Sequence, residues 1–78
     1  MTTNGTYCTT DIWLGSFLKA KGMKIIRIDG DSRRAIFVFG DTARREELIQ
    51  EFYNAGLISI TEIKNAMADL KSAIFNMA

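Results

Sequence analysis

The aspartates near the middle of the chain are the side chains that could most readily bind a cation. Asp29 and Asp31 lie one residue apart, and Asp41 follows them. A calcium-binding EF-hand loop places oxygen ligands at alternate positions, a glycine at the sixth position and a glutamate at the twelfth. Counted from Asp29, the fifth residue is Arg33 and the twelfth is Gly40, and neither supplies the required ligand. We therefore interpret these aspartates as turn residues and expect no metal site.

The residues needed for covalent or acid–base catalysis are scarce. The chain has no histidine and a single cysteine, Cys8, which excludes Cys–His and Ser–His nucleophile pairs and any internal disulfide. No P-loop and no GxGxxG motif is present to bind a nucleotide phosphate. A domain this small also rarely forms a cleft that excludes water. We expect a protein without enzymatic activity, cofactor or small-molecule substrate.

Basic residues are the remaining group that could recognise a ligand. Four of them lie on or beside an expected β-hairpin: Lys24, Arg27, Arg33 and Arg34. Arginines at the tip of a β-ribbon can contact nucleic-acid phosphates. Aspartates are interleaved with them, however, and the formal net charge of +1 provides no strong overall attraction for a polyanion. Nucleic-acid binding by these four residues is therefore the alternative hypothesis, and the simpler interpretation is a solvated turn with one Asp29–Arg34 ion pair.

Size and composition indicate one small globular domain. The chain has 78 residues, of which 47% are hydrophobic and 24% charged, so it can bury one thin core but not two. Its N-terminus lacks the basic start and apolar stretch of a signal peptide, and no apolar run is long enough to span a membrane. We expect a cytoplasmic protein with a flexible N-terminal leader at residues 1–9 and a single α+β domain at residues 10–78.

The first helix is predicted at residues 11–21. Thr10 is a suitable N-cap, because its hydroxyl oxygen can accept a hydrogen bond from a free N–H group of the first turn. Gly22 is a suitable C-terminal stop, because glycine readily adopts the conformation that ends a helix. Trp13 and Phe17 recur at helical spacing, which predicts that both face the core.

Two short segments rich in Ile, Val and Phe, residues 23–29 and 34–40, predict a β-hairpin. A two-residue loop would set Arg27 opposite Arg34, which is an unfavourable like-charge pair. We therefore prefer a four-residue loop that sets Asp29 opposite Arg34. This register divides the apolar side chains between two faces. One face carries Ile26, Ile28, Ala35, Phe37 and Phe39, and the other carries Met23, Ile25, Ile36 and Val38.

Two more helices are predicted after the hairpin. The first begins with Asp41 as its N-cap and ends near Ala55, before Gly56. The second begins with a capping box formed by Ser59 and Glu62. Its apolar residues recur at steps of three and four, which is typical of an amphipathic helix: Ile60, Ile63, Met67, Leu70, Ile74 and Met77. The expected order is helix, strand, strand, helix, helix (αββαα).

Several segments resemble a known family. They are TTDIWLGSFLKAKGMKI, IDGDSRRAIFVFGD, the end of an acidic helix at FYNAG, and LKSAIFN near the C-terminus. Together they are similar to DUF5659, a small bacterial and phage-associated family of unknown function. The resemblance covers roughly residues 7–76 and implies the α+β fold. It implies no reaction, cofactor or binding site.

A lone hairpin with two apolar faces and two open edges needs cover. Three short helices leave part of it exposed, so we expect a non-enzymatic interaction module that self-associates, most simply as a two-fold homodimer with a sheet extended across the interface. The residues expected at this contact are Ile25, Ile36, Val38, Met67, Leu70 and Ile74. For the last three, the simpler interpretation is a place in the chain's own core. The sequence leaves open whether Leu57 and Ile58 add a third strand.

Overall fold

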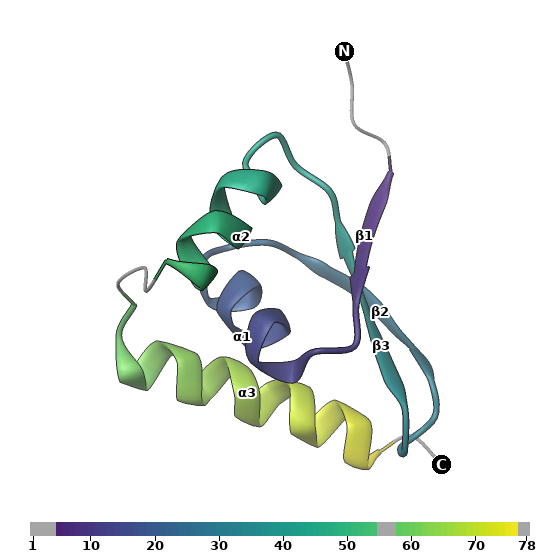
Figure 1. Ribbon diagram of the computed structural model, residues 1–78. Coiled ribbons are helices and arrows are strands. Elements are labelled where there is room, and N and C mark those ends of the chain that lie inside the picture. The colour runs from purple at the N-terminus through teal and green to yellow at the C-terminus, as the bar shows by residue number, and fades with distance from the viewer. Residues whose placement is uncertain (1–4, 55–57, 77–78) are drawn as a thin grey trace.

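Three helices cover one face of a three-stranded antiparallel sheet (Figure 1). The computed structural model describes residues 5–54 and 58–76. Along the chain the elements are β1 (Thr6–Thr9), α1 (Ile12–Ala20), β2 (Ile25–Gly30), β3 (Ala35–Gly40), α2 (Arg45–Tyr53) and α3 (Ile60–Phe75). The sheet order is β1-β3-β2, so β3 is the central strand. The predicted α+β class is confirmed, but the order is βαββαα rather than αββαα.

Strand β1 is an element that the sequence did not predict. It lies within the predicted leader and pairs antiparallel with β3, with Thr6 opposite Gly40 and Thr9 opposite Phe37. Threonine and tyrosine favour extended backbone, and without β1 the central strand would expose an unpaired edge. The prediction of a flexible leader over residues 1–9 is therefore wrong for Thr6–Thr9, and residues 1–4 lie outside the described part of the chain.

The hairpin between β2 and β3 has a tighter turn than expected. Asp31 and Arg34 exchange both of their backbone hydrogen bonds, so the loop between them contains only Ser32 and Arg33. The side chain of Asp31 holds this turn, because its Oδ1 accepts hydrogen bonds from the backbone N–H groups of Arg33 and Arg34, each at 2.9 Å. The predicted four-residue loop, with Asp29 opposite Arg34, is therefore wrong.

An irregularity between Ile25 and Arg27 changes the face on which the first residues of β2 lie. Ile25 is opposite Phe39 and packs against the core. Ile26 instead is 53% exposed, and its Cδ1 lies 3.7 Å from the place that a Cβ on Gly40 would occupy. The predicted faces of Ile25 and Ile26 are thus exchanged, because one extra residue in a strand moves side chains to the opposite face.

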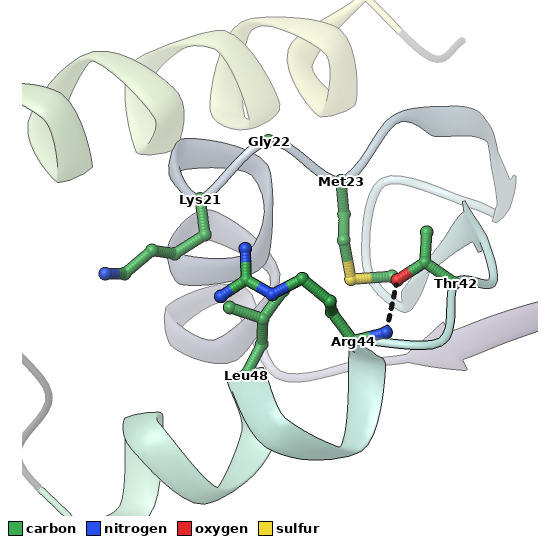
Figure 2. Close-up of a pocket in the computed structure, with 6 residues that line it drawn as sticks. All are labelled: Lys21, Gly22, Met23, Thr42, Arg44 and Leu48. Atoms are coloured by element: carbon green, nitrogen blue, oxygen red, sulfur yellow. Dashed lines mark hydrogen bonds between the residues drawn. The ribbon is translucent and has the colours of Figure 1, made fainter.

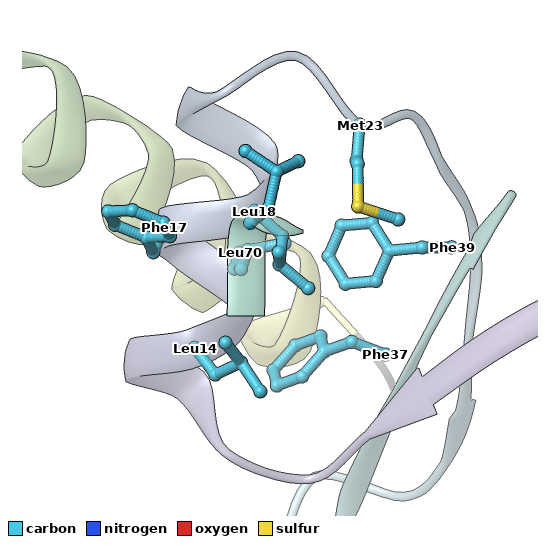
Figure 3. Packing of buried hydrophobic residues seen from close by; sticks show 8 residues of the cluster. Leu14, Phe17, Leu18, Met23, Phe37, Phe39 and Leu70 are labelled. Atoms are coloured by element: carbon cyan, nitrogen blue, oxygen red, sulfur yellow. The ribbon is translucent and has the colours of Figure 1, made fainter. Parts of the chain in front are cut away.

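The core lies between the helices and the covered face of the sheet (Figure 3). Phe37 and Phe39 project from β3, and Leu70 reaches the same cluster from α3. Helix α1 lies close to Phe37 and Leu70 at Gly15, where an added Cβ would be 3.4 Å from a Phe37 ring carbon and 3.6 Å from Leu70 Cδ1, in ordinary van der Waals contact. Met23, predicted on the other face of the hairpin, is also buried here. The cluster consists of Leu14, Phe17, Leu18, Met23, Phe37, Phe39, Leu48 and Leu70.

Helix α1 has a different cap from the one expected, and its first turn is less buried than predicted. Asp11 rather than Thr10 is the N-cap, because Asp11 Oδ1 accepts hydrogen bonds from the backbone N–H of Trp13 at 2.9 Å and of Leu14 at 3.3 Å. Residues 14–18 are all buried, whereas Trp13 is 59% exposed. The prediction that Trp13 faces the core is wrong. Residues 14–18 span more than one helical turn and are buried on all sides, whereas Trp13 lies in the first turn, before this buried part of α1.

The predicted N-cap is wrong for α2 and correct for α3. Helix α2 begins at Arg45, and its N-cap is Arg44, whose side chain makes no capping hydrogen bond to the backbone N–H groups of the first turn. The prediction of Asp41 as N-cap is wrong. In α3 the Ser59 hydroxyl accepts a hydrogen bond from the Glu62 N–H at 3.3 Å, which confirms Ser59 as the N-cap. Some predictions fall outside the described residues, namely those for Ala55, Gly56, Leu57 and Met77.

The apolar stripe of α3 is buried only along its middle. Ala66 and Leu70 are buried, and Ile63 packs against the core from a half-buried position. Ile60 is 75% exposed, because the N-terminal end of α3 projects beyond α1 (Figure 1). Ile58 lies in no strand. The amphipathic helix is therefore confirmed, but its buried stripe is shorter than predicted.

Candidate interaction surface

The face of the sheet opposite the helices is left uncovered by the described elements (Figure 1). Cys8 and Arg27 both lie directly opposite Val38, and Asp29 lies opposite Ile36. Residues directly opposite each other in a sheet share one face. Ile26 shares it too, because its side chain lies over Gly40. We call this the outer face and define it by Cys8, Ile26, Arg27, Asp29, Ile36 and Val38.

The apolar side chains of the outer face belong to β2 and β3. Val38 is fully buried although no described helix covers it, and the residues directly opposite it on the two neighbouring strands are Cys8 and Arg27. Ile36 is half-buried, and Ile26 is more than half exposed to solvent. Ile26 and Ile36 therefore supply the apolar surface that faces water on this side of the sheet.

Two opposite charges lie side by side on the same face, along β2. The Arg27 Nε donates hydrogen bonds to Asp29 Oδ1 at 3.0 Å and to Oδ2 at 3.2 Å. The side chains are 56% and 45% exposed, so the pair contributes little to the free energy of folding. The predicted ion pair between Asp29 and Arg34 is therefore wrong, because Asp29 pairs with Arg27 instead. An exposed pair of this kind remains accessible to a partner.

The edge of the sheet at β2 is unpaired within the described residues, since the strand order ends there. In an antiparallel ladder, peptide groups point alternately to one side of the strand and to the other. Asp31 and Arg34 exchange both backbone hydrogen bonds, and the same alternation directs the peptide groups of Asp29 and Arg27 to β3. The N–H and C=O of Ile28 consequently point to the open edge. This edge can accept another strand.

The structure separates the residues that were predicted to mediate self-association. Ile36 and Val38 lie on the outer face. Ile25 and Ile74 pack against the core, and Leu70 is 1% exposed within it, so these three serve the chain's own interior. Met67 is half-buried on α3. Sequence reasoning did not identify Ile26, because only the irregularity in β2 brings it to the outer face.

The four basic residues proposed for nucleic-acid binding do not form one patch. Arg33 and Arg34 are exposed at the turn, and Lys24 precedes β2 at the other end of the hairpin. The strand between them rises about 3.3 Å per residue, which separates Lys24 from the turn by roughly 20 Å. Arg27 lies between them and is paired with Asp29. Only the two turn arginines are neighbours.

A shallow hollow of about 160 Å³ lies between the end of α1 and the start of α2 (Figure 2). Its cationic groups already contact carboxylates. The Lys21 Nζ lies 3.4 Å from Glu51 Oε1, and the Arg44 Nε lies 3.1 Å from Glu47 Oε1. The backbone N–H of Arg44 donates a hydrogen bond to the Thr42 hydroxyl at 3.2 Å (Figure 2). These contacts leave the hollow without a concentrated charge that could select a ligand.

An arginine links β1 to the start of α2. The Arg45 Nε lies 3.0 Å from Asp41 Oδ1, and its guanidinium carbon lies 5.0 Å from the centroid of the Tyr7 ring. The hydrogen bond from Arg45 lowers the pKa of Asp41 below its ordinary value. Burial raises the pKa of Tyr7, although the charge of Arg45 opposes this shift. Arg45 therefore links β1 to α2. The carboxylate of Asp41 binds the Arg45 guanidinium instead of capping the helix.

The described part of the chain contains no group of three or more His, Cys, Asp or Glu side chains placed to bind a metal ion. None of its helices has the length and apolar character to cross a membrane.

A family model described as a domain of unknown function, DUF5659, matches residues 4–76. No curated protein and no solved structure matches the chain.

Proposed function

Because the chain belongs to the DUF5659 family, a domain of unknown function, we propose a role from its own surface. It is a non-enzymatic, cytoplasmic interaction module that self-associates as a two-fold homodimer. The observation that carries the proposal is the sheet itself, which the described helices cover on one face only and which ends in an unpaired edge at β2. An open edge next to exposed apolar side chains is a favourable site for another copy.

The charge distribution supports a partner of the same kind. The net charge is +1, and the outer face carries one cation beside one anion, Arg27 and Asp29. A surface with both signs is poorly suited to a polyanion but can complement itself. The exposed free thiol of Cys8 is compatible with a reducing compartment, which supports the cytoplasm as the location.

We expect the mass of the protein in solution to rise with concentration from 8.8 kDa towards twice that value. Sedimentation equilibrium over the micromolar range, with a reductant to keep Cys8 from forming disulfides, measures this directly. Replacing Ile26 by serine should weaken the dimer on the order of tenfold, because a half-exposed isoleucine would lose its apolar contact.

The matched control is Ile60→Ser, which makes the same change at an isoleucine that is 75% exposed on α3. It should leave the dimer unchanged. A mass of 8.8 kDa at every concentration would contradict the proposal. Equal weakening by Ile26→Ser and Ile60→Ser would show that the outer face is not the contact.

Nucleic-acid binding is a second candidate, favoured by the exposed arginines of the turn. Arg33 and Arg34 make no ion pair within residues 5–54 and 58–76. The double variant Arg33→Ala/Arg34→Ala should weaken binding of duplex DNA uniformly across sequences and lower the salt slope by about two. Retardation assays at low salt test it, with Arg44→Ala, at the N-cap of α2, as the control. The absence of any shift with duplex or single strands would exclude this function.

A further inference from the structure

We infer that the second copy adds to the open edge of β2, antiparallel to it, about a two-fold axis at Ile28. This inference rests on the proposed self-association and specifies its interface. The two three-stranded sheets then form one continuous sheet, with the β2 strands of the two copies side by side at its centre. The main chain, the charges and the apolar side chains of this strand each support the arrangement.

The main chain fits a two-fold axis at Ile28. The peptide groups of Ile28 point to the open edge, so in a symmetric antiparallel pair each copy donates one hydrogen bond to the other and accepts one. The neighbouring positions, Arg27 and Asp29, then form pairs without backbone hydrogen bonds between the copies. Such pairs bring the Cα atoms to about 4.5 Å, the closest approach in a sheet.

The charges of β2 complement themselves in this register. With Ile28 on the axis, Arg27 lies opposite Asp29 of the partner subunit, and the symmetry repeats the contact. Opposite charges at facing positions stabilise a strand pair, whereas like charges destabilise it. A single cation on an edge strand normally prevents pairing with another copy. Arg27 followed at the next position on the same face by Asp29 does the reverse, because each residue meets its opposite.

The other edge of the sheet offers no comparable arrangement. Strand β1 has four residues, Thr6–Thr9, and none of them is charged, so nothing there selects a register. Strand β2 has six residues, and Ile28 packs against the core from a half-buried position on its covered face. In the pair, the two Ile28 side chains would meet beneath the sheet and continue the apolar layer across the axis. The irregularity beside Arg27 ends the regular pairing, which predicts a weak and reversible dimer.

Charge exchange tests the register. Arg27→Asp places two acids on the strand and Asp29→Arg places two arginines on it, so each variant alone should dimerise on the order of tenfold more weakly than the natural chain. An equimolar mixture of the two variants should recover association as a heterodimer, since every facing pair is again opposite in sign. The double variant Arg27→Asp/Asp29→Arg should also recover it.

The control applies the same exchange to an exposed pair at the start of α2, between the N-cap Arg44 and Glu47. Arg44→Asp and Glu47→Arg change a surface ion pair that does not belong to the sheet, and both should dimerise like the natural chain. Association is measured by sedimentation equilibrium, and circular dichroism verifies that each variant is folded. Where a charge-exchanged chain does not fold, Arg27→Gln and Asp29→Asn replace it, and each should weaken the dimer severalfold.

The possible outcomes distinguish the register at Ile28 from self-association itself. Weakening by each single variant together with recovery in the mixture supports the register at Ile28. A natural chain that dimerises while its Arg27 and Asp29 variants dimerise equally well would overturn this register and leave self-association standing. A natural chain that is monomeric at every concentration would overturn both.

Discussion

Replacing Phe37 by alanine is expected to cost about 3–5 kcal/mol of the free energy of unfolding. Phe37 lies on the central strand, is 1% exposed, and has a ring carbon 3.4 Å from the place of a Cβ on Gly15 of α1. The deletion leaves a cavity bounded by the sheet, α1 and α3, which a core this small can fill only in part. A domain of 78 residues is stabilised by about 4–12 kcal/mol in total, so the variant loses about a quarter of its stability or more.

Urea unfolding followed by circular dichroism measures this loss, and the thermal midpoint should fall by about 12 °C or more. Phe75→Ala is the matched control, because Phe75 is 87% exposed near the end of α3. The same chemical change there should alter the free energy of unfolding by less than about 0.5 kcal/mol. Similar losses at the two positions would contradict the core that the structure describes.

Replacing Gly30 by alanine is expected to destabilise the protein by about 2 kcal/mol or more. Gly30 ends β2 with a φ of 85°, a conformation that residues with a Cβ adopt at a cost. An added Cβ would also collide with the backbone carbonyl oxygen of Arg34, which cannot move without opening the turn. The loss should appear as a lower urea midpoint in the same experiment.

The variant Gly22→Ala separates the conformational strain of a positive φ from the collision with a neighbouring atom. Gly22 also has a positive φ, of 105°, but a Cβ there would have no neighbour within 4 Å. This variant should cost only the conformational strain, about 1 kcal/mol. A loss at Gly30 no larger than the loss at Gly22 would show that the turn can relax around the new methyl group.

Features set by neighbours in the chain could be predicted from the sequence. Ser59 caps α3 through a residue three positions away, and the spacing of Ile63, Ala66 and Leu70 places them on one side of that helix. The alternation of apolar residues around Gly30 and Asp31 indicated the two strands of the hairpin. The α+β class and the resemblance to the family followed from these local patterns, and both are confirmed.

The candidate surface was predicted only in part. Ile36 and Val38 were predicted as residues of the contact with a second copy, and Arg27 was predicted as a residue that binds nucleic acid. Ile26 was placed on the wrong face, because an irregularity in a strand leaves no signal in a pattern of alternating residues. The pairing of Asp29 depended on the length of the turn, which the side chain of Asp31 shortens.

Residue patterns in this chain were sufficient to indicate its helices, its hairpin and the apolar side of α3, because those features arise from contacts within a few positions. Contacts between distant segments decided the rest. The polar segment Thr6–Thr9 becomes a strand only because β3 presents an edge to it. Leu70 belongs to the interior because all three described helices pack on one face of the sheet and share a single core. Strand β2 lies at an open edge because β1 pairs with the other side of β3.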